Sequence, residues 1–251
     1  RRYRGAVTRS WDAATYDRLP LPHVAWGEGV LDRLGLSGDE QVLDAGCGTG
    51  RDLARLLERH PGATAIGVDA SASMLAQARD RLAPVAGRVE LVEADLVALP
   101  PLGPVDAVMS VAAFHWVTDH DTLFAGLASV MRPGARLATD AGGQGNIANV
   151  EAGLAAVRGV TFTEKRFAGV DATRERLERA GFLVEDVRLR PDPLVIDDPA
   201  VRSLYLRTIA LGSQLAGLPA DEHAAFADAV RDAMPSPVID YVRLEIDAVR
   251  R

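Results

Sequence analysis

Short apolar runs alternate with amphipathic segments through the first 140 residues of the chain. The apolar runs predict five buried strands, at residues 41–45, 63–68, 89–92, 105–110 and 135–139. Leucines at helical spacing predict three helices between them, at residues 51–60, 71–82 and 119–131. Strands that alternate with helices of this length are typical of a parallel sheet covered on both faces. We therefore expect an α/β fold with a doubly wound, mostly parallel sheet.

The last hundred residues follow a different pattern. A strand is predicted at residues 182–189, and two helices with apolar faces are predicted at residues 199–217 and 219–234. A strand is also predicted at residues 238–248, where the apolar residues from Val242 to Ala248 alternate with the charged residues Arg243, Glu245 and Asp247. Such alternation indicates a half-exposed antiparallel strand. We expect this strand to complete a seven-stranded sheet at its end, with the two helices inserted before it.

The composition excludes several classes of protein. A net charge of −7 without a basic stripe argues against a nucleic-acid partner. No apolar run reaches the roughly 18 residues that cross a bilayer, and no apolar stretch follows the basic N-terminus as in a secretory signal. We therefore expect a cytoplasmic protein without a membrane partner. The single cysteine, Cys47, rules out a multi-cysteine metal site, and no metal is expected.

The most informative motif is a glycine-rich loop between the first strand and the first helix. The segment reads LDAGCGTG, with Asp44 in the strand and Gly46, Gly48 and Gly50 in the loop. Glycines let a ligand approach the backbone, and the following helix N-terminus offers free N–H groups. The spacing differs from the G-x-G-x-x-G of dinucleotide enzymes. The segment therefore predicts a ligand site that does not bind NAD, although a tight turn alone would also need these glycines.

Acidic residues follow the next two strands. Asp69 ends the second strand, where a carboxylate can accept hydrogen bonds from both hydroxyls of a ribose. Residues 93–96 (EADL) end the third strand, where Asp95 can accept a hydrogen bond from an adenine amino group. Ligands of such sheets bind at the carboxyl ends of the strands. A helix N-cap and an ordinary acidic loop are the alternatives for these two sites.

These motifs together resemble the class I S-adenosylmethionine-dependent methyltransferases. The similarity includes LDAGCGTG, Asp69 with Met74, EADL, the segment SVAAFHW and the segment LFAGLASVMRPGARL. More closely, the chain resembles the trans-aconitate-type branch of small-molecule methyltransferases. That branch has a Trp and a Tyr before the glycine loop, here Trp11 and Tyr16. It also has a His-Trp pair after the fourth strand, here His115 and Trp116.

The resemblance implies a cofactor site for S-adenosyl-L-methionine, which leaves as S-adenosyl-L-homocysteine. Residues expected to bind it are Tyr16, Asp44, Gly46, Cys47, Gly48, Gly50, Asp69, Ala70, Met74, Asp95, Leu96 and Ser110. His115 is the candidate catalytic residue, as a general base for a hydroxyl or carbon acid, with a structural histidine as the alternative. Cys47 is expected to pack in the loop rather than to act as a nucleophile.

The resemblance also implies a single methyltransferase domain over residues 1–251. Residues 1–36 would form a helical lid, residues 37–140 the cofactor-binding core, and residues 141–251 a C-terminal half. Within that half, the helices of residues 199–234 would cap the acceptor, because a loop of this length in a compact domain is usually functional. The alternative is that these helices only extend the core.

The expected function is methyl transfer to a small-molecule acceptor, with O-methylation of a carboxylate or a hydroxyl favoured. Two alternatives remain open at this point: a non-catalytic regulatory protein that binds S-adenosylmethionine, and a nucleotide-dependent oxidoreductase, which the glycine spacing disfavours. Nothing in the sequence indicates an oligomeric state.

Overall fold

The computed structural model describes residues 22–163 and 165–251, and Trp11 and Tyr16 lie outside these ranges. Seven strands form one sheet in the order β3-β2-β1-β4-β5-β9-β6. Their bounds are β1 (Gln41–Ala45), β2 (Thr64–Asp69), β3 (Val89–Glu93), β4 (Val105–Val111), β5 (Met131–Gly142), β6 (Phe182–Pro191) and β9 (Val242–Arg250). β9 runs antiparallel to both of its neighbours, and β1 to β5 pair in parallel. The predicted doubly wound sheet with an antiparallel last strand is thereby confirmed.

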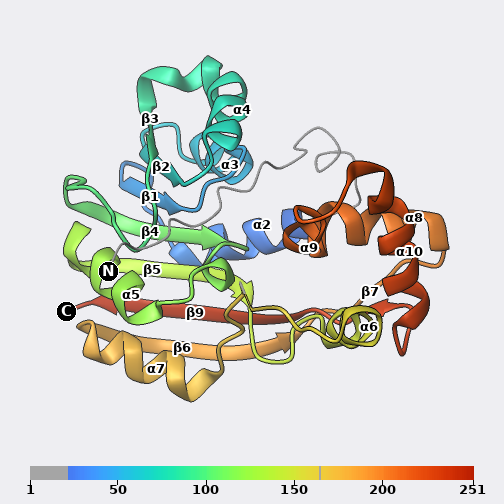
Figure 1. Ribbon diagram of the computed structural model, residues 1–251. Helices are drawn as coiled ribbons and strands as arrows, with labels where there is room; N and C mark the ends of the chain where they lie inside the picture. Colours follow the sequence, from blue (N-terminus) through green and yellow to red (C-terminus); the bar gives the residue numbers. More distant parts are fainter. Residues whose placement is uncertain (1–21, 164) are drawn as a thin grey trace, which may run out of the picture.

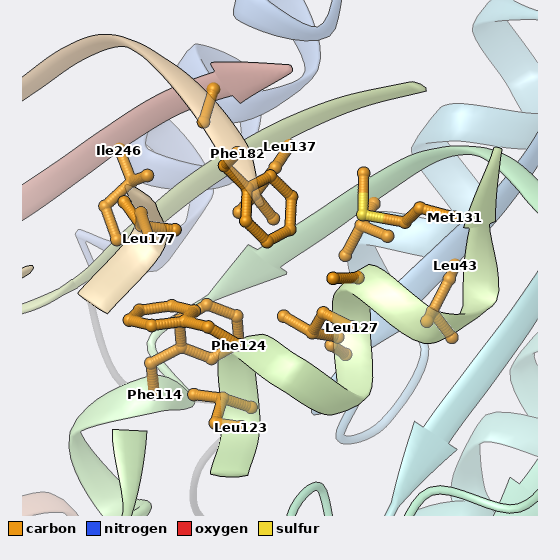
Figure 2. Close-up of a cluster of buried hydrophobic side chains, with 14 of the residues drawn as sticks. Leu43, Phe114, Leu123, Phe124, Leu127, Met131, Leu137, Leu177, Phe182 and Ile246 are labelled. Carbon is orange, nitrogen blue, oxygen red and sulfur yellow. The ribbon is translucent and has the colours of Figure 1, made fainter. Parts of the chain in front are cut away.

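Helices cover both faces of the sheet (Figure 1). On one face, leucines of α2 (His23–Leu34), α3 (Arg51–Arg59) and α4 (Ala72–Leu82) share a buried cluster with β1 and β2. On the other face, α5 (His120–Val130) and α7 (Val170–Arg179) pack on β4, β5, β6 and β9. Figure 2 shows the second cluster, where Phe124 and Leu127 of α5 point toward the sheet residue Leu137 and toward Phe182. The near-continuous apolar strands of the centre are buried because both faces are covered.

A third apolar cluster lies beyond the carboxyl ends of β4, β5 and β6 (Figure 1). We call it the C-terminal cap. Its elements are α6 (Ala148–Arg158), β7 (Leu194–Val195), α8 (Pro199–Tyr205), a π-helical turn η3 (Leu206–Ala210), α9 (Gly212–Leu215), the 3-10 turn η4 (Ala220–Glu222), α10 (His223–Ala233) and β8 (Val238–Ile239). β7 and β8 pair as a separate two-stranded ribbon. The apolar faces of the cap pack mainly against one another and against Trp26 and Tyr241.

The cap differs from the sequence prediction in three ways. The expected single helix over 199–217 is broken by the π-helical turn and a short α-helix. The expected helix over 219–234 begins instead with η4 and becomes α-helical only from His223. α6 has no counterpart in the prediction, because its alanine-rich sequence carries little apolar periodicity. Tertiary packing, rather than local pattern, fixes these elements.

The prediction for β9 is wrong in its exposure and in its position. β9 lies between β5 and β6 rather than at the end of the sheet. Its charged face is buried, with Arg243 at 1% and Glu245 at 5% exposure, and side chains of α2 contact it through Trp26 and Arg33. An alternating strand is half-exposed only when one face meets water. Here the charged face meets other charges instead.

The charged face of β9 forms a network of ion pairs. Arg243 Nε donates to Asp140 Oδ1 of β5 at 2.6 Å, and both side chains are buried. Arg33 of α2 donates to Asp247 at 2.9 Å, and Arg190 of β6 donates to Glu245 at 2.7 Å. The network therefore fixes α2, β5 and β6 to the central antiparallel strand. No helix within the described ranges is long and apolar enough to cross a membrane.

We predict that Arg243→Met destabilises the fold by about 3–5 kcal/mol, because it leaves Asp140 as a buried charge without its main partner. Arg136→Met is the matched control, because Arg136 pairs with Glu185 at 2.8 Å with both side chains about 40% exposed. The control should lose less than about 1 kcal/mol. Urea unfolding at neutral pH measures both. Equal losses for the two variants would contradict the role of the buried pair.

Candidate active site

The glycine loop turns sharply between β1 and α3. Gly46, Gly48 and Gly50 have φ angles of +90°, +52° and +72°, which favour glycine over every residue with a side chain. A Cβ at Gly46 would lie 2.3 Å from the Cβ of Ala113, so this glycine lets the segment after β4 pack on the loop. A Cβ at Gly48 would meet no atom of residues 22–163 and 165–251 within 4 Å. Within this part of the chain, the backbone at Gly48 is therefore open to a ligand.

Asp69 holds the glycine loop in place from the end of β2. Its Oδ2 accepts a hydrogen bond from the Gly48 N–H at 2.9 Å, and its Oδ1 accepts one from the Ser71 N–H at 2.8 Å. Burial raises the pKa of Asp69, and these two hydrogen bonds oppose that effect. Each carboxylate oxygen has a second lone pair for a further donor. The side chain thus has both a structural role and acceptor capacity toward the loop's open side.

Asp44 lies in β1 directly before the loop and is 2% exposed. Burial raises its pKa well above the ordinary value, and the charges of Asp52 and Asp69 add to the shift. Asp52 is paired with Arg55 at 3.3 Å. Asp44 accepts no hydrogen bond from the residues that the structure describes. A ligand with a positively charged donor near this carboxylate would compensate its burial.

The four residues predicted around an adenine lie at the carboxyl ends of β2 and β3, which are neighbouring strands. Ala70 and Asp95 are exposed, whereas Met74 and Leu96 are buried at 7% and 8% exposure. Asp95 Oδ1 accepts a hydrogen bond from the Val97 N–H at 3.1 Å, which shapes the loop. The structure thus brings these residues to the same edge as the glycine loop.

Ser110 and Cys47 are both used within the protein. The Ser110 hydroxyl donates to the carbonyl of Ala45 at 2.6 Å and joins the ends of β4 and β1. The Cys47 thiol is buried and faces Gly67, where a Cβ would lie 2.9 Å from Sγ. Burial raises the pKa of Cys47 well above its ordinary value, so the side chain is a neutral packing group.

His115 lies in the short turn η2 (Phe114–Trp116) after β4. The chain reaches this turn through Ala112, whose φ is +56°. The imidazole is 9% exposed, and its Nδ1 accepts a hydrogen bond from the Gly142 N–H at 3.2 Å. Burial lowers the pKa of His115 well below the ordinary value, and the charges of Arg243 and Lys165 add to this. The ring is therefore neutral at pH 7.

Two cations near His115 were not among the predicted site residues. Arg243 stacks on the indole of Trp26 at 3.5 Å, at the end of β9 that meets the carboxyl edge of the sheet. Lys165 lies 3.7 Å from the ring centroid of Phe162 and donates to the carbonyl of Ala210 in the cap at 2.8 Å. The charge alternation of β9 was the available signal for Arg243, but it indicated a solvent-facing residue. For Lys165 the only signal in the sequence was that it is the single lysine of the chain.

The remaining predicted site residue, Tyr16, lies outside the described residues. Within residues 22–163 and 165–251, no group of three or more His, Cys, Asp or Glu is arranged to hold a metal ion. The described part of the site therefore consists of carboxylates beside a glycine loop on one side and of His115 with two cations on the other.

Comparison with known proteins agrees with this arrangement. Residues 42–134 match a family model described as a methyltransferase domain. A trans-aconitate 2-methyltransferase from Azoarcus sp. (strain BH72) is 39% identical over 129 residues, which are 51% of this chain and 49% of that protein. The chain thus spans about half the length of the curated relatives that it matches.

Solved structures share the fold across nearly the whole chain. The [4+2]-cyclase SpnF has a TM-score of 0.65 at 21% identity, covering 98% of this chain and 88% of that one. Geranyl diphosphate C-methyltransferase from Streptomyces coelicolor A3(2), solved with Mg²⁺, geranyl diphosphate and S-adenosyl-L-homocysteine, has a TM-score of 0.61 at 20% identity. It covers 96% of this chain and 85% of that one.

The matched segment holds the glycine loop, Asp44, Asp69, Asp95 and His115, which are the residues around which the site is built. Residues 42–134 are thus similar to methyltransferase domains, and trans-aconitate 2-methyltransferases are among the sequence relatives of the chain.

Proposed function

We propose that the protein transfers the methyl group of S-adenosylmethionine to an oxygen of a small carboxylic acid. The observation that carries the proposal is the division of charge at the carboxyl edge of the sheet. The carboxylates of Asp44 and Asp69 lie beside the glycine loop, and Lys165 lies over Trp116, the residue next to His115. Arg243 and Lys165 both lower the pKa of His115. The relatives act, by their name, on trans-aconitate, which is an acid of this kind.

The residues of the loop fit the proposed cofactor. Within the described part of the chain the backbone at Gly48 is open, so it allows close approach of the methionine moiety. Asp44 has a buried carboxylate that a ligand ammonium group would compensate, and the second lone pairs of Asp69 suit two ribose hydroxyls. Asp95, Met74 and Leu96 follow on the neighbouring strand ends, where an adenine would lie. When bound, the cofactor supplies an electrophilic methyl group on a sulfonium.

The acceptor would lie between the glycine loop and the C-terminal cap. The cap is anchored beside this space, because Tyr205 of α8 hydrogen-bonds Tyr241 at 2.6 Å and Lys165 reaches Ala210. We propose that the segment 199–234 covers the acceptor and excludes water. In the described part of the N-terminal segment 1–36, α2 packs on the sheet, and only Trp26 near its start joins the cluster of the cap. Residues 37–140 would then bind the cofactor, and residues 141–251 would select the acceptor.

The contribution of the protein is to position the reactants and to control charge. Transfer needs the acceptor oxygen in line with the methyl group, and fixing that geometry removes much of the entropic barrier. Arg243 and Lys165 raise the local concentration of an anionic acceptor. The apolar cap residues keep water from the reacting centre, which strengthens these electrostatic interactions.

The first test of the proposal is ligand stabilisation. S-adenosylhomocysteine at 100 times its dissociation constant should stabilise the fold by about 2.7 kcal/mol. For a chain of this size, this corresponds to about 5–10 °C in melting temperature. NAD at the same concentration is the control and should give no comparable shift. A shift with NAD alone would contradict the assignment of the loop.

Asp69→Ala should weaken S-adenosylhomocysteine binding about ten- to a hundredfold, because two hydrogen bonds from the ribose to a charged group are lost. The variant should also lose stability, because Gly48 and Ser71 lose their acceptor. Ser71→Ala is the matched control. It removes the N-cap hydroxyl of α4 and costs about 1 kcal/mol, but it leaves the Asp69 carboxylate in place. Calorimetry should find near-unchanged affinity in the control and not in Asp69→Ala.

The acceptor is tested with a labelled methyl donor. We expect label in an ester of trans-aconitate and none after incubation with trimethyl trans-aconitate, which has no free carboxylate. The reaction is followed by extraction of the labelled product. Donor binding without transfer to any of a panel of carboxylic and hydroxy acids would contradict the enzymatic proposal and would favour a regulatory protein that binds the cofactor.

A further inference from the structure

The hydrogen bond between Gly142 and His115 determines which ring nitrogen of His115 carries the proton. The Gly142 N–H points at Nδ1 with an N···N distance of 3.2 Å. Two N–H groups cannot face each other at this distance, so Nδ1 presents its lone pair. The proton of the neutral ring is therefore on Nε2, because the hydrogen bond of one nitrogen fixes the state of the other.

Gly142 cannot turn away to release this constraint. It pairs with Arg243 in the β5–β9 ladder, and the next residue, Gly143, donates to the carbonyl of Val242 at 2.9 Å. A Cβ at Gly142 would lie 2.8 Å from Asn146 and 2.9 Å from Phe167, so the backbone there is tightly enclosed. The N–H that faces His115 is thus held by the central strands of the sheet.

The surroundings of His115 also oppose a second proton on the ring. Charged or chargeable groups face it from four elements: Arg243 of β9, Lys165 of the segment before α7, His23 of α2 and His120 of α5. Each of them disfavours an imidazolium when it carries its own charge. A general base must accept a proton at the nitrogen that faces the substrate and must become a cation. In His115 the Gly142 N–H occupies Nδ1, so Nε2 is the nitrogen left for an acceptor, and it is already protonated. The imidazolium cation is disfavoured as well.

We propose that His115 acts as a hydrogen-bond donor through Nε2–H to the anionic acceptor, and not as its general base. This inference rests on the proposed methyl transfer, and it specifies that the acceptor must already be ionised. An acceptor carboxylate oxygen forms the new bond to the methyl carbon as the sulfonium–methyl bond breaks. The electron pair of the broken bond goes to sulfur, and no proton is gained or lost. The site therefore selects acceptors that are ionised before they bind.

The roles of donor and base are separated by two variants of His115. His115→Gln keeps an N–H donor but has no basic nitrogen, whereas His115→Leu has neither. If His115 is a hydrogen-bond donor, kcat/KM for trans-aconitate should fall less than tenfold in His115→Gln and about ten- to a hundredfold in His115→Leu. If His115 is the base, both variants should fall alike by a hundredfold or more.

The pH profile of kcat/KM is an independent test of whether His115 acts as a donor or as a base. With a neutral donor, kcat/KM of the wild-type protein should be constant between pH 6 and 8, where the carboxylates of trans-aconitate are ionised and the ring is neutral. A base that titrates in this range would give a tenfold decrease per pH unit on the acidic side. Such a decrease, absent in His115→Gln, would overturn the proposal.

The tautomer is also measurable without turnover. Long-range ¹H–¹⁵N correlation spectra of the whole protein with bound S-adenosylhomocysteine should show His115 with a protonated Nε2 and an unprotonated Nδ1 at pH 7. A protonated Nδ1 or an imidazolium would overturn the inference even if methyl transfer is observed. If trans-aconitate is not methylated while the spectrum shows the Nε2–H tautomer, the proposed acceptor fails and the assignment of the ring proton stands.

Discussion

The guanidinium of Arg243 joins more parts of this molecule than any single apolar contact described above. It pairs with Asp140 of β5 inside the sheet and stacks on Trp26 of α2. It also lies near enough to His115 to influence its pKa. A buried arginine is stable only when its charge is compensated and its N–H groups are satisfied. The antiparallel strand, the first described helix and the acceptor side of the site must therefore adopt one mutual arrangement.

The parts of the fold that could be predicted are those that local pattern determines. The strands β1, β2, β4 and β5 carry apolar residues on both faces because helices cover both sides of the sheet there. The glycine loop needs residues that tolerate positive φ. The positions of Asp44 and Asp69 follow from the same rule, since they stand at strand ends beside that loop. These features are encoded within a few residues, so the sequence indicates them without knowledge of the rest of the chain.

The features that escaped prediction depend on contacts between distant segments. Arg243, Glu245 and Asp247 look like a solvent face until the charges of Arg33 and Arg190 are placed opposite them. The segment 199–217 has helical periodicity, yet its packing against α6, α10 and Tyr241 imposes a π-helical turn. The tautomer of His115 depends on Gly142, which is 27 residues away and belongs to a different strand. No local pattern carries this information.

The charges at the carboxyl edge bear on how an acidic chain would handle the acidic acceptor proposed above. The net charge of −7 repels anions at long range, and the carboxylates of Asp44 and Asp69 would repel them at the loop. In the proposed function Lys165, which lies over Trp116 beside His115, supplies the positive charge on that side. Screening by salt leaves such nearby charges dominant over distant ones. A cationic donor on the acidic side and an anionic acceptor on the basic side would each meet its opposite charge. In the proposed reaction, the same separation would direct the two reactants to opposite sides of the site, which a uniformly charged pocket would not do.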